Sequence, residues 1–312
     1  MTAPAHRGRD ALPAAAALLV NALVWGLSWW PLRRLQQAGV HPLWATAIIY
    51  LASLAVLFAA RPRAWRGFRL HRQLWLLTVA SGLTNVGFNW AVATGDVVRV
   101  VLLFYLMPLW AVLLAWLLLG ERPSGASLSR MLLALAGVAV VLKAPDAAWP
   151  VPESAADWLA LGAGFCFALT NIMLRKLSRA PAEARALAMF GGGALMGLGI
   201  ALAASVHGIA ALPPAPAVSW LQYALLLSLA FLAANLALQY GAAWLSAHST
   251  ALIMLSEVVF ASASSVALGA AELNGRIWIG GGLIVLAALW SALAADRPAA
   301  APRARDGLGR PS

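Results

Sequence analysis

The sequence predicts an all-α membrane protein in which ten transmembrane helices form two inverted five-helix repeats. Hydrophobic residues make up 62% of the 312-residue chain and charged residues only 11%, whereas a soluble domain carries roughly 25% charged residues. Apolar runs of helical length recur from one end to the other, and similar polar patterns return about halfway along the chain. So few charges exclude an ordinary soluble protein of this length.

The apolar runs predict helices because each is long enough to cross a bilayer as a helix. Lipid cannot hydrogen-bond the backbone, so only helices or closed barrels span it, and barrel strands would read as alternating segments of about ten residues. The predicted helices are 11–32, 42–60, 74–93, 97–120, 128–142, 158–174, 187–206, 220–240, 250–270 and 277–295. The run 128–142 is short for a bilayer core of about 30 Å but apolar throughout. The predicted organisation is a cytoplasmic segment 1–10, repeats 11–145 and 156–295, and a disordered cytoplasmic tail 296–312.

The distribution of basic residues predicts the orientation. With a cytoplasmic N-terminus, seventeen of the 22 Lys and Arg residues lie in inside segments, including the cluster between Arg61 and Arg72. By the positive-inside rule both termini are cytoplasmic, in a multi-pass protein of the plasma (inner) membrane. Arg7 and Arg9 before the first run resemble the start of a signal peptide, but the run is too long for one, so we expect a retained helix.

The net charge of +11 could indicate a nucleic-acid partner, but topogenic loops account for it better, so no nucleic acid is expected. The five His residues are scattered and Cys166 is the single cysteine. The sequence therefore predicts no metal site, no intrachain disulfide and no cofactor. It gives no information on the oligomeric state.

Polar residues identify the internal repeat. The segment from Trp25 to Leu35 aligns with Phe167 to Leu177, and the pair Asn85 and Asn89 aligns with Asn235 and Gln239. Intramembrane amides are costly and sparse, so these matches indicate a duplication more strongly than matching leucines do. Because five helices is an odd number, the second copy enters the membrane inverted, an arrangement that recurs in carriers.

Several motifs together resemble the drug/metabolite transporter superfamily in its EamA-type form. They are Val24 to Trp29, Leu103 to Pro108 continuing to Arg122, Ala136 to Val141, Leu255 to Phe260 and Gly280 to Val285. The resemblance covers about residues 14–295 and implies ten helices, a central cavity between the halves, and transport of metabolites. The chain departs from the family where Glu257 is followed by Val258 instead of proline, and where Gly269-Ala-Ala-Glu272 replaces Gly-Glu.

Glu257 is the leading candidate for chemistry, since it is the one acid deep inside a predicted span. A carboxylate at the bilayer centre costs at least about 2.5 kcal/mol, so it needs a proton, a partner or a wet cavity. It could meet a substrate amine or couple transport to protons. The alternative is a neutral acid in a helix contact.

The other candidates for a substrate cavity are polar or aromatic residues within the spans. Amides four residues apart share a helix face, and they either line a cavity or hold helices together. The complete predicted set is Trp25, Ser28, Trp29, Asn85, Asn89, Tyr105, Asn171, Asn235, Gln239 and Glu257. Pro108 is a candidate hinge or packing bend, and Glu121 with Arg122 is a candidate gate or an interfacial pair.

The predicted function is secondary transport of a small metabolite, amino-acid-like or another small organic solute, in the direction of export. The expected partners are that substrate, the lipid bilayer, and a proton or counter-substrate. An intramembrane enzyme is the first alternative, but no catalytic pair or metal cluster supports it. A channel or a non-transporting scaffold is the second, and no repeated selectivity element supports a channel.

Overall fold

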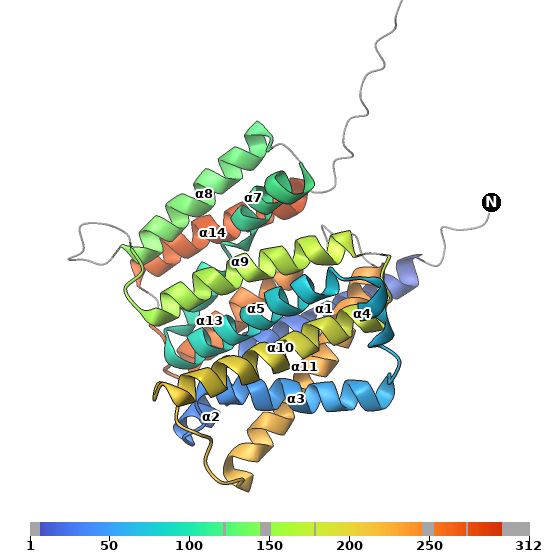
Figure 1. The fold of residues 1–312 in the computed structure, drawn as a ribbon. Coiled ribbons are helices and arrows are strands. Elements are labelled where there is room, and N and C mark those ends of the chain that lie inside the picture. Colours follow the sequence, from blue (N-terminus) through green and yellow to red (C-terminus); the bar gives the residue numbers. More distant parts are fainter. Residues whose placement is uncertain are drawn as a thin grey trace, which may run out of the picture.

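The computed structural model describes residues 7–120, 123–143, 151–177, 179–244, 253–272 and 274–294. Throughout these residues the backbone forms helices joined by turns, without a strand (Figure 1). The predicted all-α class is therefore confirmed.

The first half of the chain forms helices in nearly the positions that the apolar runs predict. They are α1 (Arg7–Leu27), α2 (Trp29–Gln37), α3 (Pro42–Ala60), the short α4 (Arg66–Leu70), α5 (Leu74–Thr94), α6 (Val97–Phe104), α7 (Met107–Leu119) and α8 (Gly125–Leu142). The second half forms α9 (Ala155–Lys176), α10 (Ala182–Val206), α11 (Val218–Trp244), α13 (Ser256–Ala267) and α14 (Gly275–Ala294). Each of the ten predicted runs overlaps at least one of these helices.

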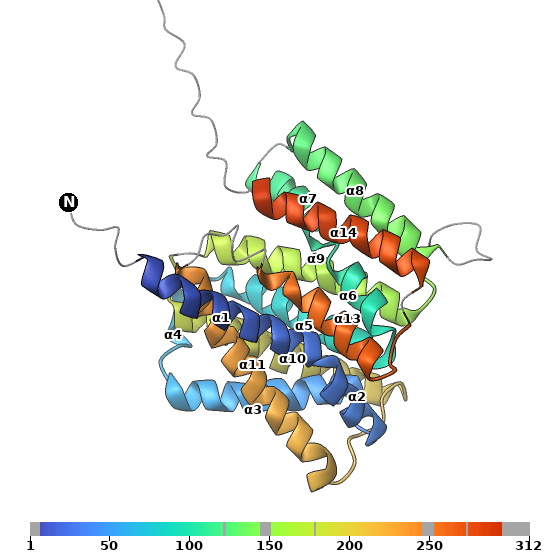
Figure 2. The same cartoon turned by 180° about the vertical axis from the view of Figure 1, so that it is seen from behind.

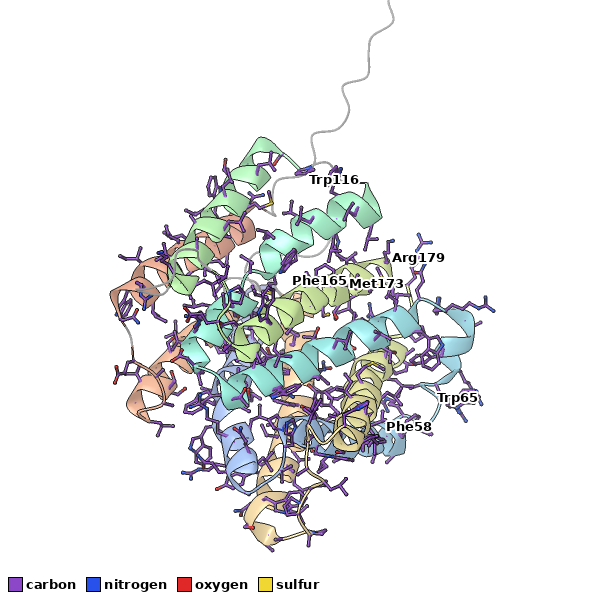
Figure 3. The ribbon with its side chains drawn as sticks, turned by 60° about the vertical axis from the view of Figure 1, so that its left-hand side comes forward. Phe58, Trp65, Trp116, Phe165, Met173 and Arg179 are labelled. Atoms are coloured by element: carbon purple, nitrogen blue, oxygen red, sulfur yellow. The ribbon has the colours of Figure 1, made fainter. Side chains whose placement is uncertain are left out.

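The described helices suit a membrane in length and composition. Six helical segments are long and apolar enough to cross one, and α8 and α14 contain shorter apolar helices. Large hydrophobic side chains, including those of Phe58, Trp65 and Trp116, project from the outside of the bundle (Figure 3). These exposed apolar side chains form a surface that lipid, not water, can cover.

Two ends of the bundle can be distinguished by their loops (Figures 1 and 2). We call the end that holds α4 the Arg66 end. We call the opposite end, at which α6 and α9 begin, the Arg99 end. On the predicted topology the Arg66 end is cytoplasmic.

Helix interruptions divide three of the predicted spans, which are the first, the fourth and the ninth. The first breaks at Ser28, between α1 and α2, and the fourth breaks at Tyr105–Leu106, between α6 and α7. Pro108 therefore lies in the first turn of α7 and not within a continuous helix as expected. Proline is accepted there because the first amides of a helix have no intrahelical partner.

The ninth span repeats the interruption of the fourth. A turn at Leu255 precedes α13, at the position equivalent to Leu106 in an alignment shifted by 149 residues. The helices that follow end alike, since Gly120 and Gly269, also 149 residues apart, take φ of 72° and 65°. Glycine adopts this left-handed conformation at helix C-termini without a steric penalty. The duplication is thus visible in the backbone as well as in the sequence.

Glycines allow the helices of the two halves to cross closely. A Cβ at Gly192 of α10 would lie 2.1 Å from the carbonyl oxygen of Thr78 in α5, and one at Gly82 would lie 2.4 Å from the oxygen of Gly192. On the next face of α10, Gly193 packs against the ring of Tyr50 from α3. Small residues are favoured where membrane helices pack backbone to backbone, so α10 lies tightly between α3 and α5.

Candidate functional site

The two halves meet at the interruptions of the fourth and ninth spans. The hydroxyl of Tyr105, from the break between α6 and α7, lies 3.0 Å from the carbonyl oxygen of Met254 and 3.0 Å from Oε2 of Glu257. Tyr105 is 3% exposed and Glu257 is 6% exposed. A buried carboxyl from one repeat and a buried phenol from the other therefore form one junction, which we call the Tyr105–Glu257 junction.

The hydrogen bonds of this junction depend on the protonation of Glu257. A phenol has a single proton and can donate to only one acceptor. If Glu257 is ionised, Tyr105 can donate either to the carboxylate or to the Met254 carbonyl. If Glu257 carries a proton, the acid can donate to the Tyr105 oxygen while Tyr105 donates to Met254, so both contacts are satisfied. The protonated form of Glu257 thus allows two hydrogen bonds at the Tyr105 hydroxyl, whereas the ionised form allows one.

Glu257 lies in the first turn of α13, where the helix dipole favours a negative charge. Within the described part of the chain, neither salt bridge of the protein involves Glu257. The site therefore provides hydrogen bonding and a helix terminus for the carboxyl group, without a basic partner among those residues.

Aromatic rings from both repeats contact one another in a series that ends at this junction. Trp25 of α1 stacks on Phe231 of α11 with ring centroids 4.4 Å apart, and its edge meets Phe88 of α5 at 6.2 Å. Phe88 contacts Phe104 at 4.8 Å, and Phe104 in turn contacts Tyr105 at 6.1 Å. A continuous set of rings therefore leads from α11 to the Tyr105–Glu257 junction.

The residues near the break of the first span hold this span to its neighbours. Ser28 donates to the carbonyl of Trp25 at 2.7 Å, and the indole nitrogen of Trp29 donates to Ser264 of α13 at 3.0 Å. Gly26 faces the backbone of α13, since a Cβ there would lie 2.9 Å from the carbonyl oxygen of Glu257. Trp25, Ser28 and Trp29 therefore belong to the same region as Glu257.

The predicted amides do not all reach this region. Asn89 is fully buried and donates to Thr46 of α3 at 3.2 Å, which is a contact between helices. Asn85 is half-buried. Gln239 is exposed and donates to Asn235 within α11 at 2.6 Å, and Asn171 is also exposed. The four-residue spacing places two amides on one face of a helix, but it does not determine what that face meets.

The candidate gate, Glu121 and Arg122, lies outside the described residues. The backbone at Pro108 is described, and it follows the interruption directly. A role for Pro108 as a hinge stays a prediction, and so do the cavity roles of the other residues.

Sequence reasoning missed the rings of Phe88, Phe104 and Phe231, because aromatic residues are common in apolar runs and carry no distinguishing pattern. It also missed Asn21, which is 1% exposed and donates to the carbonyl of Ala234 at 2.7 Å. The rule that singled out Asn85 and Asn89, a sparse amide within an apolar run, could have identified Asn21 too.

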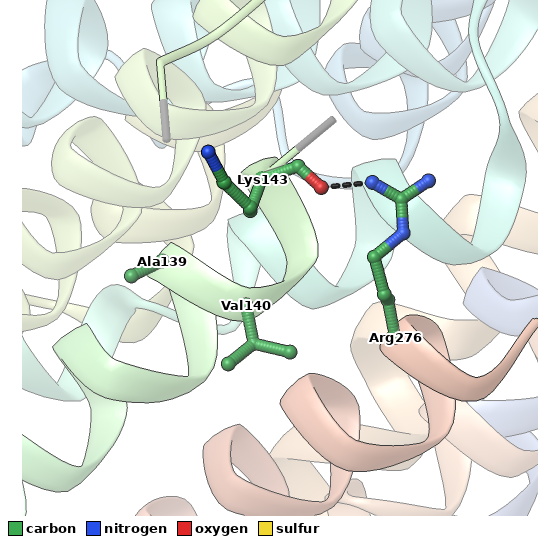
Figure 4. A pocket seen from close by; sticks show the side chains of 4 residues that line it. All are labelled: Ala139, Val140, Lys143 and Arg276. Carbon is green, nitrogen blue, oxygen red and sulfur yellow. Dashed lines mark hydrogen bonds between the residues drawn. The ribbon is translucent and has the colours of Figure 1, made fainter. Parts of the chain in front are cut away.

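A cleft of about 360 Å³ lies elsewhere, at the Arg99 end between α8 and α14. Ala139, Val140, Lys143 and Arg276 line it, and Arg276 donates to the carbonyl of Lys143 (Figure 4). None of the residues that line this cleft is a predicted site residue. Among the described residues, no group of three His, Cys, Asp or Glu side chains could hold a metal ion.

Two duplicated helical halves that meet at interrupted spans are an arrangement that recurs in membrane carriers. The chain belongs to the EamA-like transporter family, whose sequence profile matches residues 12–143 and again residues 154–293. The protein is therefore a multi-pass membrane transporter for a small molecule, and the predictions of transport and of a non-enzymatic role are confirmed. The resemblance seen in the sequence is confirmed as well.

Solved structures support the same fold. One of them, described only as a crystal structure of a protein, matches with a TM-score of 0.56 at 21% sequence identity. The match covers 90% of this chain and 96% of the other. No curated protein matches the chain.

Proposed function

We propose that the protein exports a small organic solute, amino-acid-like in chemistry, by alternating access about the Tyr105–Glu257 junction. The observation that carries this proposal is a buried carboxyl group hydrogen-bonded across the boundary between two inverted repeats. In carriers of this architecture, sites lie at the repeat interface near the middle of the membrane.

The chemistry of the junction favours a substrate with a protonated amine. A carboxylate without a basic partner among the described residues can receive such a group. The adjoining rings of Trp25, Phe88 and Phe104 offer apolar surface to the body of the solute and ring faces to its charge. A proton would compete with the amine for Glu257, which makes a proton the natural counter-substrate.

Export is the proposed direction, and the comparison of uptake with efflux described below tests it. The proposed location is the plasma membrane with both termini in the cytoplasm, and the support for this orientation is the excess of Lys and Arg in the loops at the Arg66 end.

The proposal is tested with purified protein in sealed lipid vesicles. A panel of amino acids, other primary amines and carboxylates without an amine is measured for uptake and efflux, with and without a pH gradient. We expect transport of amine-bearing solutes only. Their transport should be faster when the pH gradient drives protons in the direction opposite to the solute. Transport of the carboxylates, or of amines with no influence of the gradient, would contradict the proposed substrate class and coupling.

The orientation is tested separately with a membrane-impermeant thiol reagent on intact cells. With Cys166→Ser as the background, an Arg66→Cys variant should react only after the cells are permeabilised. An Arg34→Cys variant at the Arg99 end serves as the control and should react in intact cells. The reverse pattern would overturn the predicted topology.

A further inference from the structure

We propose that Arg99 and Asp157 form a clasp that closes the carrier at the Arg99 end, and that the equivalent positions of the repeat do not carry this pair. This inference concerns the conformational cycle and does not depend on which solute is carried. Its experiment therefore uses a readout that does not involve transport.

The clasp joins the first turns of two helices that belong to different repeats. Arg99 of α6 donates from Nε to Oδ1 of Asp157 at 3.0 Å and from an Nη to Oδ2 at 2.8 Å, and Asp157 lies in the first turn of α9. This two-pronged geometry gives the strongest and most directional form of an arginine–carboxylate pair. The contact therefore fixes both the distance and the relative orientation of α6 and α9.

The pair is shielded from water. The side chain of Asp157 is 3% exposed and that of Arg99 is 19% exposed. Asp157 also accepts from the backbone amide of Glu153 at 3.0 Å, and Arg99 donates to the carbonyl of Val141 at 3.4 Å. Removing one partner from a buried pair leaves the other charge uncompensated, so α6 and α9 separate only if both groups become hydrated.

Close packing continues below the clasp. Gly164, two turns further along α9, lies against α6, since a Cβ there would be 2.7 Å from the carbonyl oxygen of Phe104. Ala160, between Asp157 and Gly164 on α9, is fully buried. The closed contact therefore extends from the clasp towards the Tyr105–Glu257 junction, and the clasp lies at its entrance.

The internal repeat does not carry an Arg–Asp pair at the equivalent positions. In the alignment shifted by 149 residues, the position of Arg99 corresponds to His248, and in the alignment shifted by 142, the position of Asp157 corresponds to Ala15. Alanine has no charge with which to complete a pair. Two inverted repeats with identical contacts would favour neither state, whereas a clasp at one end favours the state that is closed there.

A cysteine reporter beneath the clasp tests the inference. The background variant carries Cys166→Ser and Ala160→Cys. The rate of its reaction with a water-soluble thiol reagent is measured in permeabilised vesicles, so that the reagent reaches both faces of the membrane. We expect slow reaction in this background. Arg99→Ala and the more conservative Asp157→Asn should each raise the rate of cysteine labelling by about tenfold or more. A shift of about 1.4 kcal/mol in the open–closed equilibrium corresponds to a factor of ten.

The chain offers a matched control in Glu153→Gln. Glu153 is also paired with Arg99, but at 3.8 Å and with 46% of its side chain exposed. Such exposed pairs contribute little, so this variant should react at the rate of the background. If Arg99→Ala and Asp157→Asn both remain folded and leave the labelling rate unchanged, the pair does not control opening at this end and the inference fails. An equal rise in all three variants would also contradict it.

Discussion

Replacing Glu257 with Gln is expected to remove the effect of a pH gradient on transport and to slow transport of amine substrates by about tenfold or more. A charge-assisted hydrogen bond contributes about 1.5–3 kcal/mol, and 1.4 kcal/mol corresponds to a factor of ten. Glutamine keeps the size of the side chain and can donate permanently to the Tyr105 oxygen, so it mimics the protonated acid. The variant should therefore keep its fold and lose its ability to exchange a proton for a solute.

Initial rates in sealed vesicles, measured at several gradients, give both quantities. Tyr105→Phe is the matched control, because it removes the two hydrogen bonds of the hydroxyl group and leaves the carboxyl group in place. This control should alter the rate but retain a response to the gradient. If Glu257→Gln transports at the normal rate with the normal response, Glu257 is a structural residue and the coupling proposal is wrong.

A Gly192→Val substitution is expected to prevent stable packing of the two halves. The added side chain would meet the backbone oxygen of Thr78 at 2.1 Å and the amide nitrogen of Gly82 at 2.9 Å. Backbone atoms of two helices cannot move aside as a flexible side chain can, so α5 and α10 would have to separate. Overpacking in a core costs about 1–3 kcal/mol, and we expect a loss at the upper end of this range or beyond it.

Thermal unfolding of the purified protein in detergent measures this loss, together with the yield of monodisperse protein. Gly199→Ala on the same helix is the control, because Gly199 is exposed and a Cβ there meets no atom within 4 Å. It should unfold at the wild-type temperature or slightly above it. Equal stability of Gly192→Val and the control would show that α5 and α10 pack differently from the arrangement described above.

Most of the fold could be predicted because its determinants are local in the sequence. Apolar runs of helical length locate the spans, and a sparse set of intramembrane polar residues reveals the duplication. The interruptions at Ser28, Tyr105 and Leu255 could not be located in this way. A break in a membrane helix is stabilised by contacts with other helices, such as the one between Tyr105 and Met254, and those contacts are not visible in a local pattern.

The site was predictable only in part, for a related reason. Glu257 was identified because an acid in a span is costly wherever it faces. The amides Asn171, Asn235 and Gln239 carry a smaller cost, so they occur at lipid-facing and interfacial positions as well, and the sequence does not distinguish these from buried ones. The Arg99–Asp157 pair joins residues 58 positions apart. Each of them lies in the first turn of a helix, at the end of a span, where charges are ordinary.

The spread of helix lengths has a consequence for the surrounding lipid. At about 1.5 Å per residue, the 18 residues of α8 span roughly 27 Å and the 27 residues of α11 roughly 40 Å. A hydrocarbon layer of about 30 Å therefore matches α8 almost upright, whereas α11 fits only when tilted by roughly 40°. Figure 1 shows α11 crossing the bundle obliquely. Acyl chains of different length would change this hydrophobic mismatch and, with it, the tilt at which α11 fits the bilayer.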